Sequence, residues 1–254
     1  MEVHHHSHTV PIAIGRKSWK HYFWEFFMLF LAVTLGFFVE NQREHYVEHQ
    51  KTKQYASSLA DDLKKDTLAF RVLKKSYTSD IDKIDTFRNM LKYNSISQIP
   101  VGSLYYYCEP VIWAKAIVFH DATIQQLKNS GNLRYFPTAL QNKISEYDRL
   151  TRELSSRQEN ELYFSRVSRE IMTGIFDAES ILAITNALGT KDVEMLREKD
   201  IKLINKDTLL LKKLANEIIF RQGSWQYRLQ QIIEPTNLAA IDLLAHLQKE
   251  YHLN

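Results

Sequence analysis

The sequence has little cysteine, glycine or proline: its 254 residues include one cysteine, seven glycines and five prolines. The single cysteine, Cys108, excludes a disulfide framework within the chain and any cysteine-rich zinc site. Glycine and proline usually make up about 12% of a protein, more than twice their share here. Because these residues form many turns, a chain so poor in them is expected to be helical.

The sequence also lacks a large excess of either charge, since its formal net charge is +3. This balance gives no indication of a nucleic acid partner. A composition of 44% hydrophobic and 25% charged residues is that of a folded protein and excludes a disordered chain. No Walker loop, dinucleotide-binding glycine pattern, zinc-protease motif or nucleophile elbow is found. We therefore predict neither an enzymatic activity nor a cofactor.

One stretch, Tyr22 to Val39 (YFWEFFMLFLAVTLGFFV), is far more apolar than the rest of the chain. As a helix its 18 residues would span about 27 Å, close to the roughly 30 Å of a bilayer core. Aromatic residues that suit the membrane interface and basic residues that can snorkel lie at its N-terminal end: Trp19, Tyr22, Trp24, Arg16, Lys17 and Lys20. The alternative is a buried helix of a soluble domain. We predict a transmembrane segment at 21–39.

This segment is predicted to remain as a signal anchor and not to be cleaved as a signal peptide. The residues after it, Phe38 to Gln42, contain no pair of small residues at the spacing of a cleavage site. Basic residues precede the segment, and Glu40, Arg43, Glu44 and Glu48 follow it. The positive-inside rule then places residues 1–20 in the cytoplasm and residues 40–254 outside, in the periplasm of a Gram-negative cell. The expected location is the inner membrane, with a single pass.

Glu25 is an acidic residue within this apolar segment, about one turn from the basic flank. One interpretation is a contact in an oligomer or an ion path. The other, which we favour, is a carboxylate near the interface that is protonated or snorkels to water. Ala32 and Gly36 form only a loose version of the small-residue motif that brings membrane helices together.

Two groups of histidines are low-probability metal ligands. The N-terminal tail contains His4, His5, His6 and His8, a run that can bind zinc, copper or nickel. His45 and His49 lie four residues apart and would share one helix face, which holds a divalent metal when a third ligand is available. We favour a flexible tail and a solvated helix face, and predict no metal site.

The chain from Glu40 to Tyr93 is predicted to be one long helix that continues from the membrane segment. Apolar residues recur every seven positions, and a second row is interrupted by Asp66 and Asp80. Such rows are typical of a helical-bundle or coiled-coil seam with polar breaks. The first row comprises Leu63, Phe70, Tyr77, Ile84 and Leu91, and the second Leu59, Leu73 and Phe87.

Three further helical regions are expected after a loop at 94–103. The second spans 104–130 and is irregular near Pro110. The third starts after Pro137, has a polar break at 155–161 and ends at Gly189. The last is capped by Asp207 or Asn205 and is kinked or restarted at Pro235. Four long helical regions predict an all-α, up-down bundle of one domain over residues 40–254.

Two polar or aromatic groups in these regions resemble parts of binding sites. Tyr105, Tyr106, Tyr107 and Trp113 would line a ligand cleft, although such aromatics more often belong to a core or interface. His120 and Asp121 have the residue types of a catalytic dyad, but an oriented histidine at a buried turn is the favoured interpretation.

Several segments resemble those of one family. These are the anchor EFFMLFLAVTLGFFVENQRE at 25–44, Leu-Lys at 127–128, Ser-Gly-Asn-Leu-Arg at 130–134, Tyr147, and Lys-Glu-Tyr-His-Leu at 249–253. They are similar to segments of single-span, all-helical, membrane-anchored proteins of the Bacteroidota. The resemblance implies a membrane anchor and an all-helical extracytoplasmic domain. No activity or catalytic residue is known for that family, so none is implied for this chain.

The Ser-Gly-Asn-Leu-Arg segment also has a structural interpretation of its own. Gly131 supplies a positive φ at a helix end, Asn132 tolerates a turn and Leu133 returns to the core. Arg134 is expected to pair with a carboxylate on a neighbouring helix. We favour this interpretation over a binding role.

Three functions are consistent with these patterns, and all assume the lipid bilayer as a partner. The favoured one is a structural or interaction scaffold at the periplasmic face of the inner membrane, with a protein partner or as a homo-oligomer. The second is a periplasmic ligand-sensing bundle that signals through a partner, because the cytoplasmic tail is short. The third is an accessory subunit of a transport or channel complex, with Glu25 in its interface.

Overall fold

The computed structural model describes residues 18–199 and 201–253 and divides the chain at Lys51 into two compact units. The regular structure of the described residues is helical, with no strand and a single isolated bridge between Phe176 and Leu203. The prediction of an all-α chain is therefore confirmed for these residues. The predicted tail at 1–20 lies almost entirely outside them.

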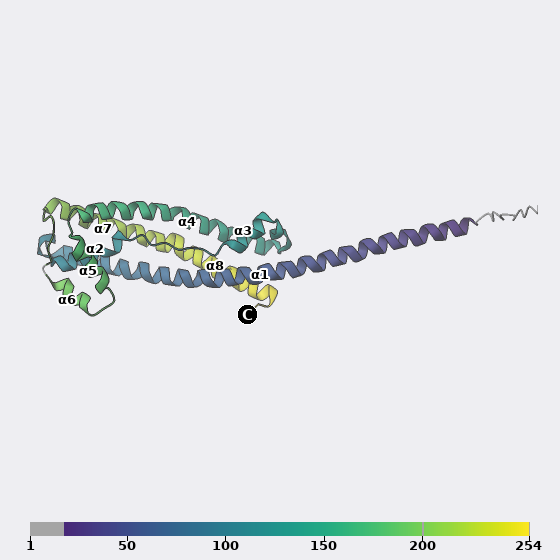
Figure 1. Ribbon diagram of the computed structural model, residues 1–254, viewed down its shortest axis with the longest axis horizontal. Helices are drawn as coiled ribbons and strands as arrows, with labels where there is room; N and C mark the ends of the chain where they lie inside the picture. Colours follow the sequence, from purple (N-terminus) through teal and green to yellow (C-terminus); the bar gives the residue numbers. More distant parts are fainter. Residues whose placement is uncertain (1–17, 200, 254) are drawn as a thin grey trace, which may run out of the picture. The chain divides into compact units, whose positions relative to one another are not determined.

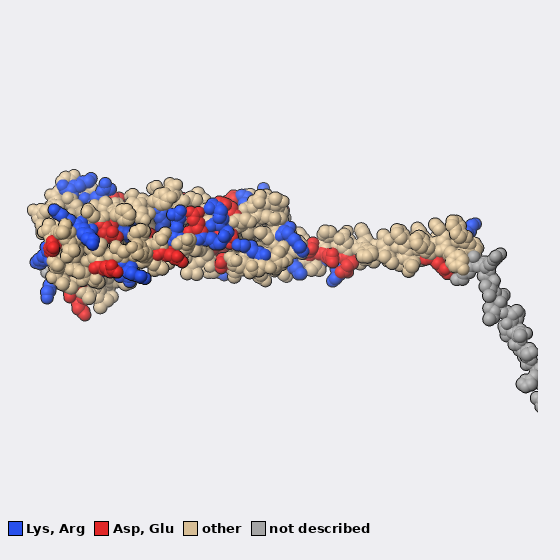
Figure 2. Space-filling model, turned by 90° about the horizontal axis from the view of Figure 1, so that it is seen from above, with Lys and Arg blue, Asp and Glu red and all other residues tan. Residues whose placement is uncertain are grey.

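Helix α1 (Trp19–Tyr93) begins in the first unit and includes the whole apolar segment. An 18-residue window of this helix is apolar enough to cross a membrane, and none of it is buried. Figure 2 shows how few charged side chains this part of the helix carries. A helix that is apolar on all sides needs an apolar environment around it, as a bilayer provides.

In the second unit, from Thr52 onward, α1 buries the two rows expected from the sequence except for Leu91, which is half-buried. Leu59, Leu63, Phe70, Tyr77, Ile84 and Phe87 are fully buried, and Leu73 is nearly so. The two interruptions, Asp66 and Asp80, are buried as well. The stripe is therefore a core face, and its polar breaks must find partners inside the protein.

The second predicted region is not one helix. Helix α2 (Val101–Ile112) begins inside the predicted loop, after the 3₁₀ turn η1 (Ile96–Gln98). Residues 113–121 form no regular structure, and α3 (Ala122–Asn129) follows them. Pro110 lies inside α2, where it removes one backbone hydrogen bond of the helix, and the helix ends two residues later.

The third region starts where it was expected, but its first helix ends earlier than predicted. Helix α4 (Thr138–Thr173) begins directly after Pro137, as expected. It runs without the predicted break at 155–161 and ends before Gly174. Two shorter helices, α5 (Ala178–Ala187) and α6 (Asp192–Glu198), then follow, and Gly189 between them has a φ of +79°.

The last region runs as α7 (Thr208–Arg228), a π-helical turn (Leu229–Ile233) and α8 (Glu234–Tyr251). Asp207 caps α7 by accepting a hydrogen bond from the Leu209 N–H at 2.8 Å. Pro235 cannot donate to the turn before it, and the chain widens so that the Glu234 N–H donates to the Leu229 carbonyl. The predicted restart at Pro235 therefore takes the form of a π turn.

The long helices of the second unit run in two opposite directions (Figure 1), which their side-chain contacts define. Tyr147 of α4 contacts Asp66, and Glu161 lies beside Trp225, which packs on Tyr77. Helix α4 therefore runs in the same direction as α1. The α7–α8 segment runs the opposite way, because its Gln222 contacts Ile81 and its Glu234 contacts Lys74.

The segment 113–121 lies along α1 in the opposite direction and takes the place of a fourth long helix. Lys115 pairs with Asp80, and His120 contacts Asp66. We call this segment the strap. Helix α2 lies at the C-terminal end of α1, whereas α4 starts further back along α1. The strap carries the chain back between these two places, so that α1 and α4 can run in the same direction.

Gly102 of α2 sits against the backbone of α6, and only a glycine fits there. A Cβ at this position would lie 1.9 Å from the Leu196 carbonyl oxygen, and the Gly102 N–H donates to the Lys199 carbonyl at 3.1 Å. We expect Gly102→Ala to lower the free energy of unfolding by about 1 to 3 kcal/mol, measured by thermal denaturation.

Gly223 of α7 is the matched control, because a Cβ there meets nothing within 4 Å. Gly223→Ala should stabilise the protein by about 0.5 to 1 kcal/mol, since alanine is the better helix former. Equal effects of the two substitutions would contradict the close packing of α2 on α6.

Candidate functional site

Glu25 has a partner on its own helix in the structure. His21 Nε2 lies 3.0 Å from Glu25 Oε1, one turn away, and both side chains are about half exposed within the chain. A role of Glu25 in an oligomer or an ion path stays a prediction.

The histidines do not form a metal centre among residues 18–199 and 201–253. His4, His5, His6 and His8 lie outside the described residues. His45 Nδ1 lies 3.8 Å from Glu48 Oε2, and no group of three side chains able to hold a metal ion occurs in the described part of the chain.

His120 is oriented by Asp66 of α1 and not by its neighbour Asp121. The buried Asp66 carboxylate accepts hydrogen bonds from the His120 backbone N–H (3.0 Å) and the Tyr147 hydroxyl (2.7 Å), and His120 Nδ1 lies 2.9 Å from it. Burial, with the Asp66 charge beside it, raises the pKa of Tyr147, so the hydroxyl keeps its proton and donates. The catalytic-dyad alternative therefore loses its second residue, and the contacts join the strap to α1 and α4.

The aromatic residues expected to line a cleft are divided between the core and the surface. The Tyr105 hydroxyl accepts from the Asp177 N–H at 2.6 Å and lies 3.1 Å from the Lys202 carbonyl. The Tyr107 hydroxyl accepts from Arg197 at 2.8 Å, whereas Trp113 is half exposed. Tyr105 and Tyr107 thus connect α2 to the segments around α5 and α6 and do not form a ligand cleft with Trp113.

The Ser-Gly-Asn-Leu-Arg segment forms the end of α3 as expected. Gly131 has a φ of +68°, and Leu133 packs against the core. Asn132 Nδ2 donates to the Tyr55 hydroxyl at 3.0 Å. Arg134 stacks on the Tyr135 ring and donates to its hydroxyl at 2.8 Å; its pairing with a carboxylate stays a prediction.

The most unusual chemistry lies inside the second unit, where one carboxylate faces two arginines. Glu161 of α4 accepts from Arg221 Nη2 at 2.8 Å and from Trp225 Nε1 at 3.3 Å, and Arg228 Nη1 lies 3.4 Å from its second oxygen. The Arg221 side chain is 0% exposed, Arg228 is 6% and Glu161 is 4%. With Tyr77, which packs edge-on against Trp225, these residues form what we call the Glu161 cluster.

The Glu161 cluster has more donors than acceptors. Arg221 Nε, Arg221 Nη1, Arg228 Nε and the Tyr77 hydroxyl are buried, and no described residue hydrogen-bonds to them. Burial raises the pKa of Tyr77, so its hydroxyl remains a neutral donor. Buried polar groups in proteins are nearly always paired, and an unpaired set is a candidate for a bound ligand or water.

A small pocket of about 150 Å³ lies between α4 and α7 next to this cluster. Glu161 and Arg228 line it, together with the ring of Phe164 and the side chain of Ile232. Arg157 lies at the same pocket and is held by Glu153, whose Oε1 accepts from Arg157 Nη2 at 3.0 Å.

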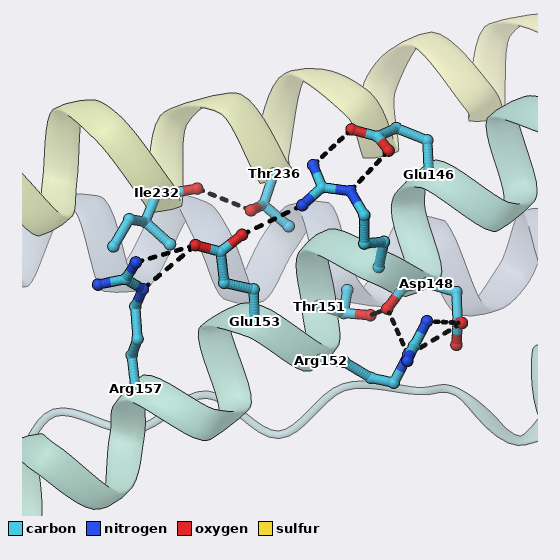
Figure 3. A network of polar contacts seen from close by, with 9 residues as sticks. Glu146, Asp148, Thr151, Arg152, Glu153, Arg157, Ile232 and Thr236 are labelled. Carbon is cyan, nitrogen blue, oxygen red and sulfur yellow. Dashed lines mark hydrogen bonds and ion pairs between the residues drawn. The ribbon is translucent and has the colours of Figure 1, made fainter.

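Arg157 is the last residue in a series of ion pairs along α4. Figure 3 shows the two carboxylates of this series, Glu146 and Glu153. Arg149 connects the two, with distances of 2.7 Å to Glu146 and 3.2 Å to Glu153. Because Glu153 already pairs with two arginines, the charge of Arg157 at the pocket is partly neutralised from its own helix.

Sequence reasoning did not find the Glu161 cluster. In the last region, apolar residues recur every seven positions at Ile218, Trp225 and Ile232. Arg221 and Arg228 lie three residues after the first two of these, on the same face and seven residues apart. Arginines at core positions of an apolar row are the signal that would have indicated a buried charge.

A larger hollow of about 480 Å³ lies at the turn between α1 and α2. Apolar side chains from the turn and from the start of α7 line it, among them Ile99, Leu104 and Leu211. Glu198 and Lys206 supply one charge of each sign. Its size is within the usual range for small-molecule sites.

Comparison of the chain with protein-family models, with curated proteins and with solved structures gives no match. Function is therefore argued from the residues and their geometry.

Proposed function

We propose that this chain is a single-pass, membrane-anchored scaffold whose helical bundle, within residues 40–254, binds another protein outside the cytoplasm. The observation that carries the proposal is the apolar part of α1, none of which is buried in the structure, whereas the unit from Thr52 onward has a core of its own. The charge difference across the apolar segment supports a cytoplasmic N-terminus at the inner membrane.

Four aromatic residues on α4 and α7 support the proposal that the chain binds another protein. Tyr163 and Phe164 have ring centroids 5.7 Å apart, and Phe164 and Phe220 are 6.3 Å apart. Tyr227 shares the small pocket with Phe164. Tyr163, Phe220 and Tyr227 are each more than half exposed. Exposed aromatics beside arginines are typical of protein interfaces, and we call this group the α4–α7 aromatic surface.

A photo-crosslinking amino acid at Phe220 tests this proposal in native membranes. We expect one adduct with a distinct protein, and none from the same amino acid at Leu182 of α5, which is also about half exposed. With that protein purified, Phe220→Ala should weaken binding by about tenfold or more, while Leu182→Ala leaves it unchanged.

Two results would contradict the scaffold with a separate partner. One is that the amino acid at Phe220 and the amino acid at Leu182 give the same adducts, because the partner would then not bind preferentially at the aromatic surface. The other is an adduct of twice the chain's own mass, which would indicate a homo-oligomer in place of a different partner.

A ligand-sensing role is the second candidate, and the 480 Å³ hollow favours it. Glu198 and Lys206 at this hollow offer complementary charges to a small zwitterion such as an amino acid. The test is a thermal-shift screen of amino acids with the full chain in detergent. A shift that Lys206→Gln removes would support sensing, and no shift across the set would contradict it.

A further inference from the structure

The Glu161 cluster contains one positive charge more than its own carboxylate can neutralise. Arg221 and Arg228 share Glu161. The other charged groups nearby are already paired: Lys115, which lies over the Tyr77 and Trp225 rings, pairs with Asp80, and Arg157 pairs with Glu153. A buried charge without a counter-ion is costly, so an anion at this place would be favourable.

Of the described residues with unpaired donors, Arg228 is the one that also lines the small pocket. Arg228 donates through Nη1 to the Arg157 carbonyl at 3.2 Å, yet its Nε has no partner among the described residues. Both Glu161 oxygens are already engaged, by Arg221 and Trp225 on one side and by Arg228 on the other. The cluster therefore needs acceptors and not further donors.

The pocket beside Arg228 has the size and lining for such an acceptor. Its 150 Å³ is roughly the volume of five water molecules. Phe164, Tyr227 and Ile232 give it an apolar side, while Asn160 and Ser224 add two neutral polar groups. An apolar wall favours an anion with a short alkyl chain over a strongly hydrated inorganic ion.

We propose that this pocket binds a small aliphatic carboxylate, with its carboxylate group on the Arg228 guanidinium and its alkyl chain against Phe164 and Ile232. A planar guanidinium suits a planar carboxylate, and the Arg228 side chain is itself only 6% exposed. This site goes beyond the scaffold role and does not depend on it, because it requires neither a membrane orientation nor a protein partner.

Titration of the full chain in non-ionic detergent with butyrate tests the site. The readouts are the melting temperature and the intrinsic fluorescence of tryptophan, since Trp225 belongs to the cluster. Butyramide has the same shape without the charge, while chloride and inorganic phosphate at equal ionic strength test for a general anion effect. We expect a saturable rise in melting temperature with butyrate alone.

Arg228→Gln should weaken butyrate binding by about tenfold or more, because it removes the charged donor. The control Arg149→Gln, on the exposed ion-pair chain of α4, should bind like the unmodified protein. Ser224→Leu fills the pocket without changing the charges, so it should also abolish butyrate binding. This second variant keeps the site testable if Arg228→Gln fails to fold.

Three results would overturn the proposal. Equal effects of butyrate and butyramide would show that the charge is not recognised. Equal effects of butyrate and chloride or phosphate would indicate an adventitious ion only. Unchanged butyrate binding by both folded Arg228→Gln and Ser224→Leu would place the ligand elsewhere on the chain.

Discussion

Asp66→Ala is expected to lower the free energy of unfolding by about 3 to 5 kcal/mol. The Asp66 carboxylate is 1% exposed and accepts from the His120 N–H and the Tyr147 hydroxyl. Alanine would leave both donors buried or half-buried without an acceptor, and would leave a cavity between α1, α4 and the strap. Chemical denaturation followed by circular dichroism measures the loss.

Asp61→Ala is the matched control for Asp66→Ala. Asp61 lies on the same helix, its side chain is 62% exposed, and it pairs with Lys64 over 3.5 Å. Exposed ion pairs contribute little, so the change should stay within about 0.5 kcal/mol. A loss at Asp66 as small as that at Asp61 would mean that the strap is not held by this carboxylate.

The second large effect is expected from Glu161→Gln, which should also cost about 3 to 5 kcal/mol in the free energy of unfolding. The substitution keeps the size of the side chain but leaves Arg221 and Arg228 without a buried counter-charge. The loss should appear in the same denaturation experiment.

Glu153→Gln provides the comparison, because Glu153 also contacts two arginines, Arg149 and Arg157, but its side chain is 39% exposed. Solvent screens these pairs, so the expected loss is below about 1 kcal/mol. If Glu161→Gln were as mild as Glu153→Gln, water and not Glu161 would be compensating the two buried arginines.

The sequence predicts best those features that depend on local chemistry. Pro137 directly precedes α4, Asp207 caps α7, and Gly131 adopts a positive φ after α3. Each depends on the conformational preference of one residue and its nearest neighbours. The heptad rows of α1 are equally local, since their spacing alone defines one face.

Features that depend on distant partners were not predicted. The strap contains apolar residues such as Ile117 and Phe119 and resembles a helix in sequence. It is extended because Asp66, Asp80 and Gln158, which lie 35 or more residues away, bind its polar groups. The polar residues at 155–161 resemble a helix break in sequence for a similar reason, because the partners of Gln158 and Glu161 lie on distant parts of the chain.

The candidate site was the least predictable part. The polar run at 155–161 ends in Glu161, whose partners Arg221 and Arg228 are 60 and 67 positions further along the chain. A glutamate that becomes buried and one that stays solvated look the same in the sequence, and only the fold distinguishes them. His120 was predicted to be oriented at a turn, but its partner was unknown until α1 and the strap were placed together.

Cysteine labelling in intact cells tests the central proposal, a membrane anchor with residues 40–254 outside the cytoplasm. The native Cys108 is fully buried, and burial raises the pKa of its thiol well above the usual range, so it should not react. Leu209→Cys places a thiol at a position that is 74% exposed, and Ser7→Cys places one in the predicted cytoplasmic tail.

The proposal predicts that a membrane-impermeant maleimide, admitted to the periplasm by opening only the outer membrane, labels Leu209→Cys. Ser7→Cys should become labelled only after the inner membrane is dissolved. Labelling of Ser7→Cys but not Leu209→Cys in intact spheroplasts would show the opposite orientation and contradict the proposed topology. A Leu209→Cys protein that leaves the membrane fraction in alkaline carbonate would contradict the anchor itself.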